Sequence, residues 1–424
     1  MQFNIRLLIA VPVVVGLHAS AETYSLRRIK PLSDRSHDQT SANAIDSAGN
    51  VVGSSSSSTS QSVTVGVVMW TDGSIISTGT LADCFPYGGS AVAGVSPGGI
   101  LTGSSSSICG GYARAMRSTV AHPSAFTTHA PLPGGGDCVG TDASDSGAIV
   151  GWSNIQDGCV APLCIFTNAR AMKWLPASQV TLSTGTYAVA AANGINASGI
   201  TVGNGLTMQD YETSVAVRWD TDISAPVHLL AVNGTYGVAN KISDGGVVVG
   251  TSDDGPHRKA TKWIGSNVNG QTLGAMPGHT ESEALDVDDL RGVVGLSRPE
   301  STSSSVAVLF RDGEVIHLNN RLSAPNGVLL TSANGINTNG WIAANGILEG
   351  KSFGFVLVPC FADLNGDGVV EDSDFTVFVF AYNILDCADA IMPAHCPSDL
   401  NRDGLVDDAD FVVFVGAYNE LLCP

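Results

Sequence analysis

The C-terminal part of the chain carries one acidic pattern twice. Each copy is a run of twelve residues with oxygen-bearing side chains at positions one, three, five and twelve, and the two copies are 36 residues apart. A calcium ion takes about six to eight oxygen ligands, which such a loop supplies from these side chains and from a backbone carbonyl at position seven. The predicted ligands are Asp363, Asn365, Asp367, the carbonyl of Val369 and Asp374 in the first run, and Asp399, Asn401, Asp403, the carbonyl of Leu405 and Asp410 in the second.

Three further features bear on this prediction. Glu371 and Asp407 stand at position nine, where a water usually lies between the side chain and the metal. Gly368 and Gly404 stand at position six, where the loop turns sharply. The simpler interpretation is an ordinary turn, since Asp, Asn and Gly all favour turns. Because the pattern recurs at a fixed offset, we expect two bound Ca²⁺ ions, and we expect metal binding to be coupled to folding.

The elements around the loops differ from those of an EF-hand. The residues before the first loop, 355–359, are an apolar run that ends in proline, while a helix is expected only after each loop. This doubled loop-helix unit resembles the type I dockerin module, through which secreted bacterial proteins dock onto cohesin modules. The resemblance covers residues 360–424 and implies a small α-helical calcium-binding domain, with a cohesin-like protein or a cell-surface scaffold as its partner.

The two expected helices have apolar residues in excess of what one small core needs. One face is predicted to form the core, through Phe375, Phe378, Val379 and Tyr382 in the first helix and Phe411, Phe414, Val415 and Tyr418 in the second. On the other side, Val377, Phe380 and Val413 predict a docking surface, or else a surface packed against the rest of the chain. The dockerin resemblance adds loop positions ten and eleven to the partner-binding set, namely Asp372, Ser373, Asp408 and Ala409.

Four cysteines follow the same 36-residue offset, namely Cys360, Cys387, Cys396 and Cys423. A small domain with little core gains about 2–4 kcal/mol from a disulfide in an oxidising compartment. Two pairings respect the duplication: Cys360–Cys387 with Cys396–Cys423, or Cys360–Cys423 with Cys387–Cys396. The closeness of the termini in dockerins favours the second pairing, and the flanking cysteines resemble those of the GC-type dockerin.

The N-terminal residues predict export. Arg6 precedes an apolar run over residues 7–17, and small residues at 19–21 form a cleavage site, so residues 1–21 are predicted to be a secretory signal peptide. No later run reaches the roughly 18 apolar residues that a membrane span requires. The net charge of −19 disfavours a nucleic-acid partner. We expect a secreted bacterial protein, extracellular or associated with the cell surface.

Residues 22–359 contain a repeat. Seven copies of a short Asn/Asp/Ser-containing turn each lead to a closing residue, and the closing residues are 45–52 positions apart: Gly53, Gly103, Gly151, Gly203, Gly250, Gly295 and Ala344. A third strand that ends in an aromatic residue follows in five copies, at Trp70, Trp174, Trp219, Trp263 and Phe310. Such periods are typical of propeller blades. The pattern resembles the extracellular HAF repeat family.

The fold class is therefore expected to be mainly β, with a propeller of seven blades over residues 22–359 followed by the small calcium-binding domain. Residues 24–32 look like an isolated fourth strand, which would complete the last blade and close the ring. An open β-solenoid or two stacked sheets are the alternatives for the same repeat.

For function, the leading interpretation is a secreted non-enzymatic protein whose propeller serves as a recognition or scaffold surface, with an extracellular glycan as a further class of partner. The alternative is a polysaccharide-degrading glycoside hydrolase delivered by a dockerin, and a third interpretation is a surface adhesin. The paired carboxylates Asp253–Asp254 and Asp288–Asp289 lie in or beside repeat turns, where Asp accepts hydrogen bonds from the backbone. No catalytic residue is predicted.

Overall fold

A computed structural model describes residues 22–33, 38–57, 63–80, 89–106, 112–155, 169–207, 213–300, 304–323, 327–365, 369–393 and 396–418. The chain divides into two compact units, of which one is Tyr24–Val358 and the other combines Pro359–Pro424 with the residues before Tyr24. The predicted signal peptide, residues 1–21, lies outside the described residues. Glu22 and Thr23, which the sequence analysis placed with the repeats, belong to the C-terminal unit.

The larger unit consists of seven four-stranded sheets, each of which is one blade. Blade one contains β2 (Gln39–Ile45), β3 (Val51–Ser57), β4 (Val63–Met69) and β5 (Ile75–Gly79). Blade two contains β6 (Gly89–Val95), β7 (Ile100–Ser106), β8 (Ala113–Thr119) and β9 (His122–Thr128). Blade three contains β10 (Cys138–Ala143), β11 (Ile149–Asn154), β12 (Ala169–Trp174) and β13 (Gln179–Thr181). Blade four contains β14 (Tyr187–Ile195), β15 (Thr201–Thr207), β16 (Ser214–Trp219) and β17 (Val227–Leu229). Blade five contains β18 (Gly237–Ile242), β19 (Val247–Asp254), β20 (His257–Ile264) and β21 (Gln271–Gly274). Blade six contains β22 (Glu281–Asp288), β23 (Gly292–Arg298), β24 (Val306–Arg311) and β25 (Glu314–His317). Blade seven contains β26 (Val328–Ile336), β27 (Ile342–Leu348) and β28 (Lys351–Pro359), together with β1 (Tyr24–Arg28) from the N-terminal end of the described chain.

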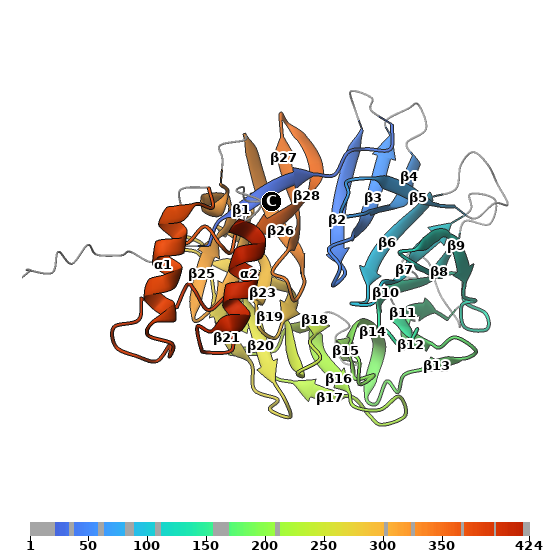
Figure 1. Ribbon diagram of the computed structural model, residues 1–424. Coiled ribbons are helices and arrows are strands. Elements are labelled where there is room, and N and C mark those ends of the chain that lie inside the picture. The colour runs from blue at the N-terminus through green and yellow to red at the C-terminus, as the bar shows by residue number, and fades with distance from the viewer. Residues whose placement is uncertain are drawn as a thin grey trace, which may run out of the picture. The chain divides into compact units, whose positions relative to one another are not determined.

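The blades form a closed ring, so the predicted seven-bladed propeller is confirmed. The first strands of successive blades contact one another in the order β2, β6, β10, β14, β18, β22, β26 and back to β2, and they surround the central channel. Figure 1 shows the blades following one another around this ring. In the last blade β1 pairs with β28, which confirms that the N-terminal strand completes the ring.

The closing glycines of blades one to six lie opposite a bulge in the inner strand. In blade five the register between β18 and β19 shifts between Ala239 and Lys241, and this brings the Val238 carbonyl over Gly250. A methyl group at Gly250 would lie 2.0 Å from that oxygen, and the closing glycines of blades one to four and six meet the same obstacle at 1.9–2.0 Å. Any side chain at these positions would collide with the backbone.

The aromatic residues of the third strands fill the spaces between sheets. Trp174, Trp219, Trp263 and Phe310 are all buried, and Trp219 and Trp263 donate their indole N–H groups to the carbonyls of Ser183 and Leu230 at 2.7 and 2.8 Å. Trp and Phe bury a large apolar area, and a buried indole usually finds such an acceptor. The Trp174 Nε1 has none among the described residues. Trp70 is only partly buried.

The C-terminal unit is built from two helices, α1 (Asp372–Tyr382) and α2 (Asp408–Tyr418). Phe378 packs on Phe411 and Phe414 with ring centroids 5.9 and 5.0 Å apart, so that the start of each helix faces the end of the other. Tyr382 and Tyr418 repeat this relation, because each donates its hydroxyl to the aspartate at the start of the opposite helix, Asp408 and Asp372 respectively. The duplication seen in the sequence is thus a two-fold relation in space.

The predicted apolar face of α1 needs a correction. Val377, predicted to lie on the docking surface, is buried in the module core, whereas Phe375 and Val379, predicted for the core, are exposed. The buried positions are Asp374, Val377, Phe378 and Ala381, which share one face of the helix. Asp374 must point into its loop, and this sets the rotation of the whole helix. No helix among the residues that the structure describes is long and apolar enough to cross a membrane.

Candidate functional site

In the first loop, the carboxylate at position twelve organises the backbone. Asp374 is fully buried, and its Oδ1 and Oδ2 accept the N–H groups of Asn365 and Glu371, both at 2.9 Å. Asp363, at position one, is also buried. Asn365 donates from its side chain to Ser373 Oγ at 2.8 Å. The predicted ligand Asp367 lies outside the described residues, as does Gly368, while Val369 is described and exposed.

The second loop repeats this arrangement. Asp410 is fully buried and accepts the N–H groups of Leu400 at 2.7 Å, Asn401 at 2.9 Å and Asp407 at 3.0 Å. Further side-chain oxygens accept from the loop backbone at 2.9–3.1 Å: Asp399 from Asp403 and Gly404, Asn401 from Asp403, and Asp403 from Leu405. Gly404 has a φ of +93°, a value that favours glycine at this turn.

One carboxylate in each loop has a raised pKa, mainly because of burial. Burial raises the pKa of Asp374, and the charge of Asp363 raises it further. Burial likewise raises the pKa of Asp399, with a smaller contribution from Asp410. Arg402, the basic residue of the second loop, has its Nη2 3.6 Å from Glu22 Oε2. The loops thus gather partly buried carboxylates and amide oxygens, a donor set that suits Ca²⁺.

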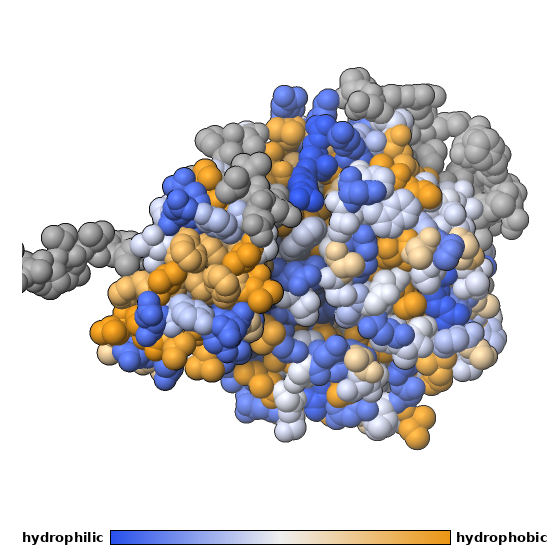
Figure 2. All heavy atoms as spheres, viewed as in Figure 1, coloured by the Kyte–Doolittle hydropathy of each residue, from blue (hydrophilic) through white to orange (hydrophobic). Residues whose placement is uncertain are grey.

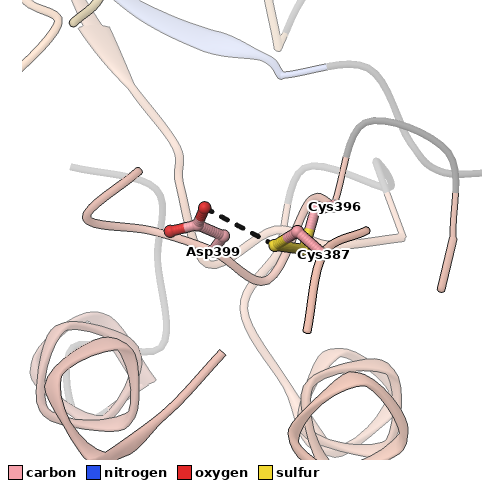
Figure 3. Close-up of side chains that lie close together, drawn as sticks. All are labelled: Cys387, Cys396 and Asp399. Atoms are coloured by element: carbon pink, nitrogen blue, oxygen red, sulfur yellow. Dashed lines mark hydrogen bonds between the residues drawn. A yellow bond between two sulfur atoms is a disulfide. The ribbon is translucent and has the colours of Figure 1, made fainter. Parts of the chain in front are cut away.

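A disulfide lies beside the second loop. Cys387 is bonded to Cys396, and the Cys387 sulfur lies 3.6 Å from Asp399 Oδ2, as Figure 3 shows. Because the sulfur is part of a disulfide, it carries no proton, so this approach is a contact in which the sulfur donates nothing. The same bond removes both sulfurs as thiolate ligands for a metal. Of the two pairings considered, only the one with Cys387–Cys396 remains; Cys360 is also disulfide-bonded, and Cys423 lies outside the described residues.

Some of the predicted docking residues form hydrogen bonds within the module, and others are exposed apolar side chains. Asp372 and Asp408 accept the tyrosine hydroxyls described above, while Ser373 donates to Glu371 Oε1 at 3.0 Å. The backbone N–H of Ala409 donates to Asp407 Oδ1 at 2.8 Å. Phe380 and Val413 are 43% and 42% exposed. Figure 2 shows apolar side chains gathered over the two helices, where the exposed residues include Phe375, Val379, Phe380, Phe411, Val412 and Val413.

A charged cluster in the propeller channel was missed by the sequence analysis. Lys241, on β18 of blade five, places its Nζ 2.6 Å from Asp142 Oδ1, on β10 of blade three. The other Asp142 oxygen accepts the N–H of Ile195 at 2.9 Å, and Asp286 Oδ2 accepts that of Ile336 at 2.9 Å. Each aspartate therefore joins its own blade to the next one.

Two members of this cluster, Asp286 and Lys241, have raised pKa values. Burial raises the pKa of Asp286 to about 6, although the charge of Lys241 acts in the opposite direction. For Lys241, burial acts to lower the pKa, but the charges of Asp142 and Asp286 leave it raised. All three residues stand at the bulge of an inner strand, where the other blades have Gly or Ala. Aligning the seven repeats position by position would have revealed them.

The paired carboxylates noted in the sequence have structural partners. Asp253 Oδ2 accepts the N–H groups of Thr235 and Tyr236 at 3.2 and 2.9 Å. Asp289 accepts from the N–H of Gly245 at 2.7 Å and from the Ser243 hydroxyl, which ties blade six to blade five. Asp288 accepts the N–H of Arg291 at 2.8 Å. These acids act as turn and blade connectors.

Comparisons with known proteins add little beyond the fold. No family model and no curated protein matches the chain. Among solved structures, a protein described as TolB from Agrobacterium tumefaciens aligns with a TM-score of 0.43 at 10% identity, over 67% of this chain and 93% of that one. TolB from Acinetobacter baumannii aligns with a TM-score of 0.37 at 12% identity, over 58% of this chain and 61% of its own. At these values, the likeness carries no functional argument.

Proposed function

We propose that this is a secreted, calcium-binding, non-enzymatic protein whose propeller serves as a recognition or scaffold surface. In this proposal, residues 360–424 form a dockerin-like module that attaches the propeller to a cohesin-type protein or cell-surface scaffold. The HAF-like repeat and the GC-type cysteine arrangement support the proposal through resemblance. The predicted signal peptide, residues 1–21, supports the proposed bacterial extracellular or cell-surface location.

The observation that carries the proposal is the repeated geometry of the two loops. In both, a fully buried aspartate at position twelve lies in the first turn of a helix and accepts backbone N–H groups from its own loop. A carboxylate held in this way is fixed in direction, and its neighbours are further oxygen donors. Bound Ca²⁺ would supply the positive charge that offsets these carboxylates, with Asp363, Asn365 and Asp374 holding one ion and Asp399, Asn401, Asp403 and Asp410 the other. Metal binding and folding of the module are then coupled.

The docking surface is proposed to include Phe380 and Val413 together with loop positions ten and eleven. Phe375 and Val379 join this surface because the structure exposes them. Val377 is no longer part of the proposal, since it lies in the core.

Calcium titration of the protein by isothermal calorimetry tests the first step. We expect the uptake of two ions per chain, reduced to one by Asp374→Ala or by Asp410→Ala, because each substitution removes the position-twelve ligand of one loop. Asp389→Ala, which changes an exposed aspartate between the loops, is the matched control and should leave both sites intact. Absence of calcium uptake by the unmodified protein would refute the proposal.

The glycoside hydrolase alternative rests on one observation. Asp286 combines a raised pKa with a place in the channel beside a second buried aspartate, and paired carboxylates of unequal pKa perform glycoside hydrolysis. Against it, both carboxylates are already bonded to backbone N–H groups, and Asp142 is paired with Lys241. Turnover of a polysaccharide that is lost in Asp286→Asn, whose fold is retained, would favour the enzyme; glycan or protein binding without turnover favours the scaffold.

A further inference from the structure

The first two described residues of the chain belong to the calcium-binding module. The carbonyl of Thr23 accepts the N–H of Cys360 at 2.9 Å, and the Thr23 hydroxyl donates to Asp363 Oδ2 at 3.1 Å. Glu22 Oε2 lies 3.6 Å from Arg402 Nη2. Residues 22 and 23 thus contact both loops, although some 340 residues of sequence separate Thr23 from Asp363.

Thr23 acts on the first predicted ligand of the first loop. Asp363 is only 3% exposed, so its orientation depends on the few groups around it. The Thr23 hydroxyl engages one carboxylate oxygen, Oδ2, and so fixes the direction of the other. Hydrogen bonds to charged acceptors are stronger than those between neutral groups. A ligand held before the metal arrives costs less ordering when the metal binds.

Glu22 acts on the second loop through Arg402, which stands at loop position four. The Glu22 side chain is 13% exposed and that of Arg402 is 28% exposed, so the pair is partly shielded from solvent. Arg402 has a φ of +65°, which places it at a constrained point of the turn. The guanidinium of Arg402 is thus paired with Glu22, a carboxylate that does not belong to the loop. Without Glu22, this cation would compete with Ca²⁺ for the loop carboxylates.

The next residue along the chain begins the strand that closes the propeller. Tyr24 is the first residue of β1, which pairs with β28 as the fourth strand of blade seven, and its side chain is buried in the core of that blade. Thr23 and Tyr24 are joined by one peptide bond. A restraint on the backbone of Thr23 therefore also restrains Tyr24, the first residue of β1.

We propose that Glu22 and Thr23 are positioning residues of the calcium-binding module, and that calcium uptake by the two loops is thermodynamically linked to closure of the propeller ring by β1. This inference rests on the proposed function, because it needs the loops to bind Ca²⁺. Linkage is reciprocal. Weaker contacts of residues 22 and 23 with the loops should therefore lower calcium affinity, and bound calcium should slow the local opening of β1.

The first test is calcium titration of the full-length protein and three variants. Thr23→Val keeps the shape of the side chain but removes the hydroxyl, and we expect affinity for one ion to fall about ten-fold. Thr23→Ser keeps the hydroxyl and is expected to bind like the unmodified protein. Glu22→Gln is expected to weaken the second ion about three-fold, at low salt only, as for a partly exposed ion pair. Equal affinity of the Val and Ser variants overturns the positioning role.

The second test measures amide hydrogen exchange of residues 24–28 with calcium and with a chelator. We expect calcium to slow exchange in β1 about ten-fold in the unmodified protein and in Thr23→Ser, and to have less than a two-fold effect in Thr23→Val. If the protein takes up two ions but the amide exchange rates in β1 are the same with and without calcium, this inference is overturned, and the calcium proposal still stands. No calcium uptake by the unmodified protein overturns both.

Discussion

The propeller and the C-terminal module bury carboxylates in different ways. In the propeller channel, Asp142 and Asp286 flank Lys241, and backbone N–H groups of neighbouring blades complete their bonding. In the module, Asp374 accepts backbone N–H groups, while burial, with a smaller contribution from the charge of Asp363, raises its pKa. The propeller carries its own counter-charge for its buried acids. In the module, the one basic residue among the described loop positions, Arg402, lies beside Glu22, so the loop carboxylates should depend on a cation from outside.

The largest effect is expected from a closing glycine of the propeller. Gly250→Ala would place a methyl group 2.0 Å from the Val238 carbonyl, where two backbone segments would have to separate. We expect a loss of about 4 kcal/mol in the stability of the propeller, measured by urea unfolding of the propeller transition. Gly416→Ala in α2 is the control, since a methyl group there meets nothing within 4 Å. A propeller transition that is unchanged in Gly250→Ala would contradict the role assigned to the bulge.

The channel cluster tests whether the propeller neutralises its own acids. Lys241→Ala would leave the buried Asp142 without its ion-pair partner, and we expect a loss of about 3 kcal/mol. This lies at the low end for a buried pair because the Lys241 side chain is 24% exposed. Lys30→Ala, at an exposed lysine of the same unit, should change stability by less than about 0.5 kcal/mol. If added calcium rescued Lys241→Ala, the two regions would not differ as described.

His129 gives the propeller a pH dependence at acidic pH. Burial, aided by the charge of Arg117, lowers the pKa of His129 to about 4, and its ring lies 5.9 Å from that of Trp174. Its stabilising contribution is therefore complete above pH 6.5 and is lost as the pH falls towards 4. Asp286, with a pKa raised to about 6, acts in the opposite direction over nearly the same range.

The two contributions are separated by substitution. In His129→Phe, the loss of stability between pH 7 and pH 4.5 should be smaller than in the unmodified protein by about 2 kcal/mol. Urea unfolding of the propeller at the two pH values measures this difference. Identical pH dependence in both proteins would show that His129 titrates normally in the folded state.

The smallest effects distinguish the core of the module from its proposed docking surface. Val377→Ala removes buried apolar atoms and should cost the module about 2 kcal/mol, whereas Phe380→Ala should cost less than about 0.5 kcal/mol. Thermal unfolding of the module in calcium measures both values. Phe380→Ala, and not Val377→Ala at equal folded fraction, should weaken capture of a cohesin-type partner. A stability loss in Phe380→Ala as large as in Val377→Ala would place Phe380 in the core instead.

The sequence predicted the parts of the fold that repeat. Gly250 and its equivalents, and Trp174, Trp219 and Trp263, recur because each blade needs the same close approach and the same filling. A single strand at residues 24–28 could be assigned to the last blade because that repeat lacked its fourth strand. These features are local to one blade, and seven copies make them visible.

What the sequence did not reveal depends on contacts between distant residues. The rotation of α1 was set by the inward direction of Asp374, and an apolar stripe counted from Phe375 therefore missed Val377. Lys241 and Asp142 are 99 residues apart and meet only once the ring is closed. Thr23 is the second residue after the predicted signal peptide, and no local pattern links it to Asp363. Each case needs the closed structure, because the partner lies in another repeat or at the other end of the chain.

The most direct test of this account is scanning calorimetry of the protein in calcium and in chelator. We expect two transitions. The one belonging to the C-terminal module should move upward by more than about 10 °C in calcium at 1,000 times the dissociation constant, while the transition of the propeller should move much less. If neither transition responds to the chelator, the carboxylates of the module are stable without a cation, and the contrast between the two regions is wrong.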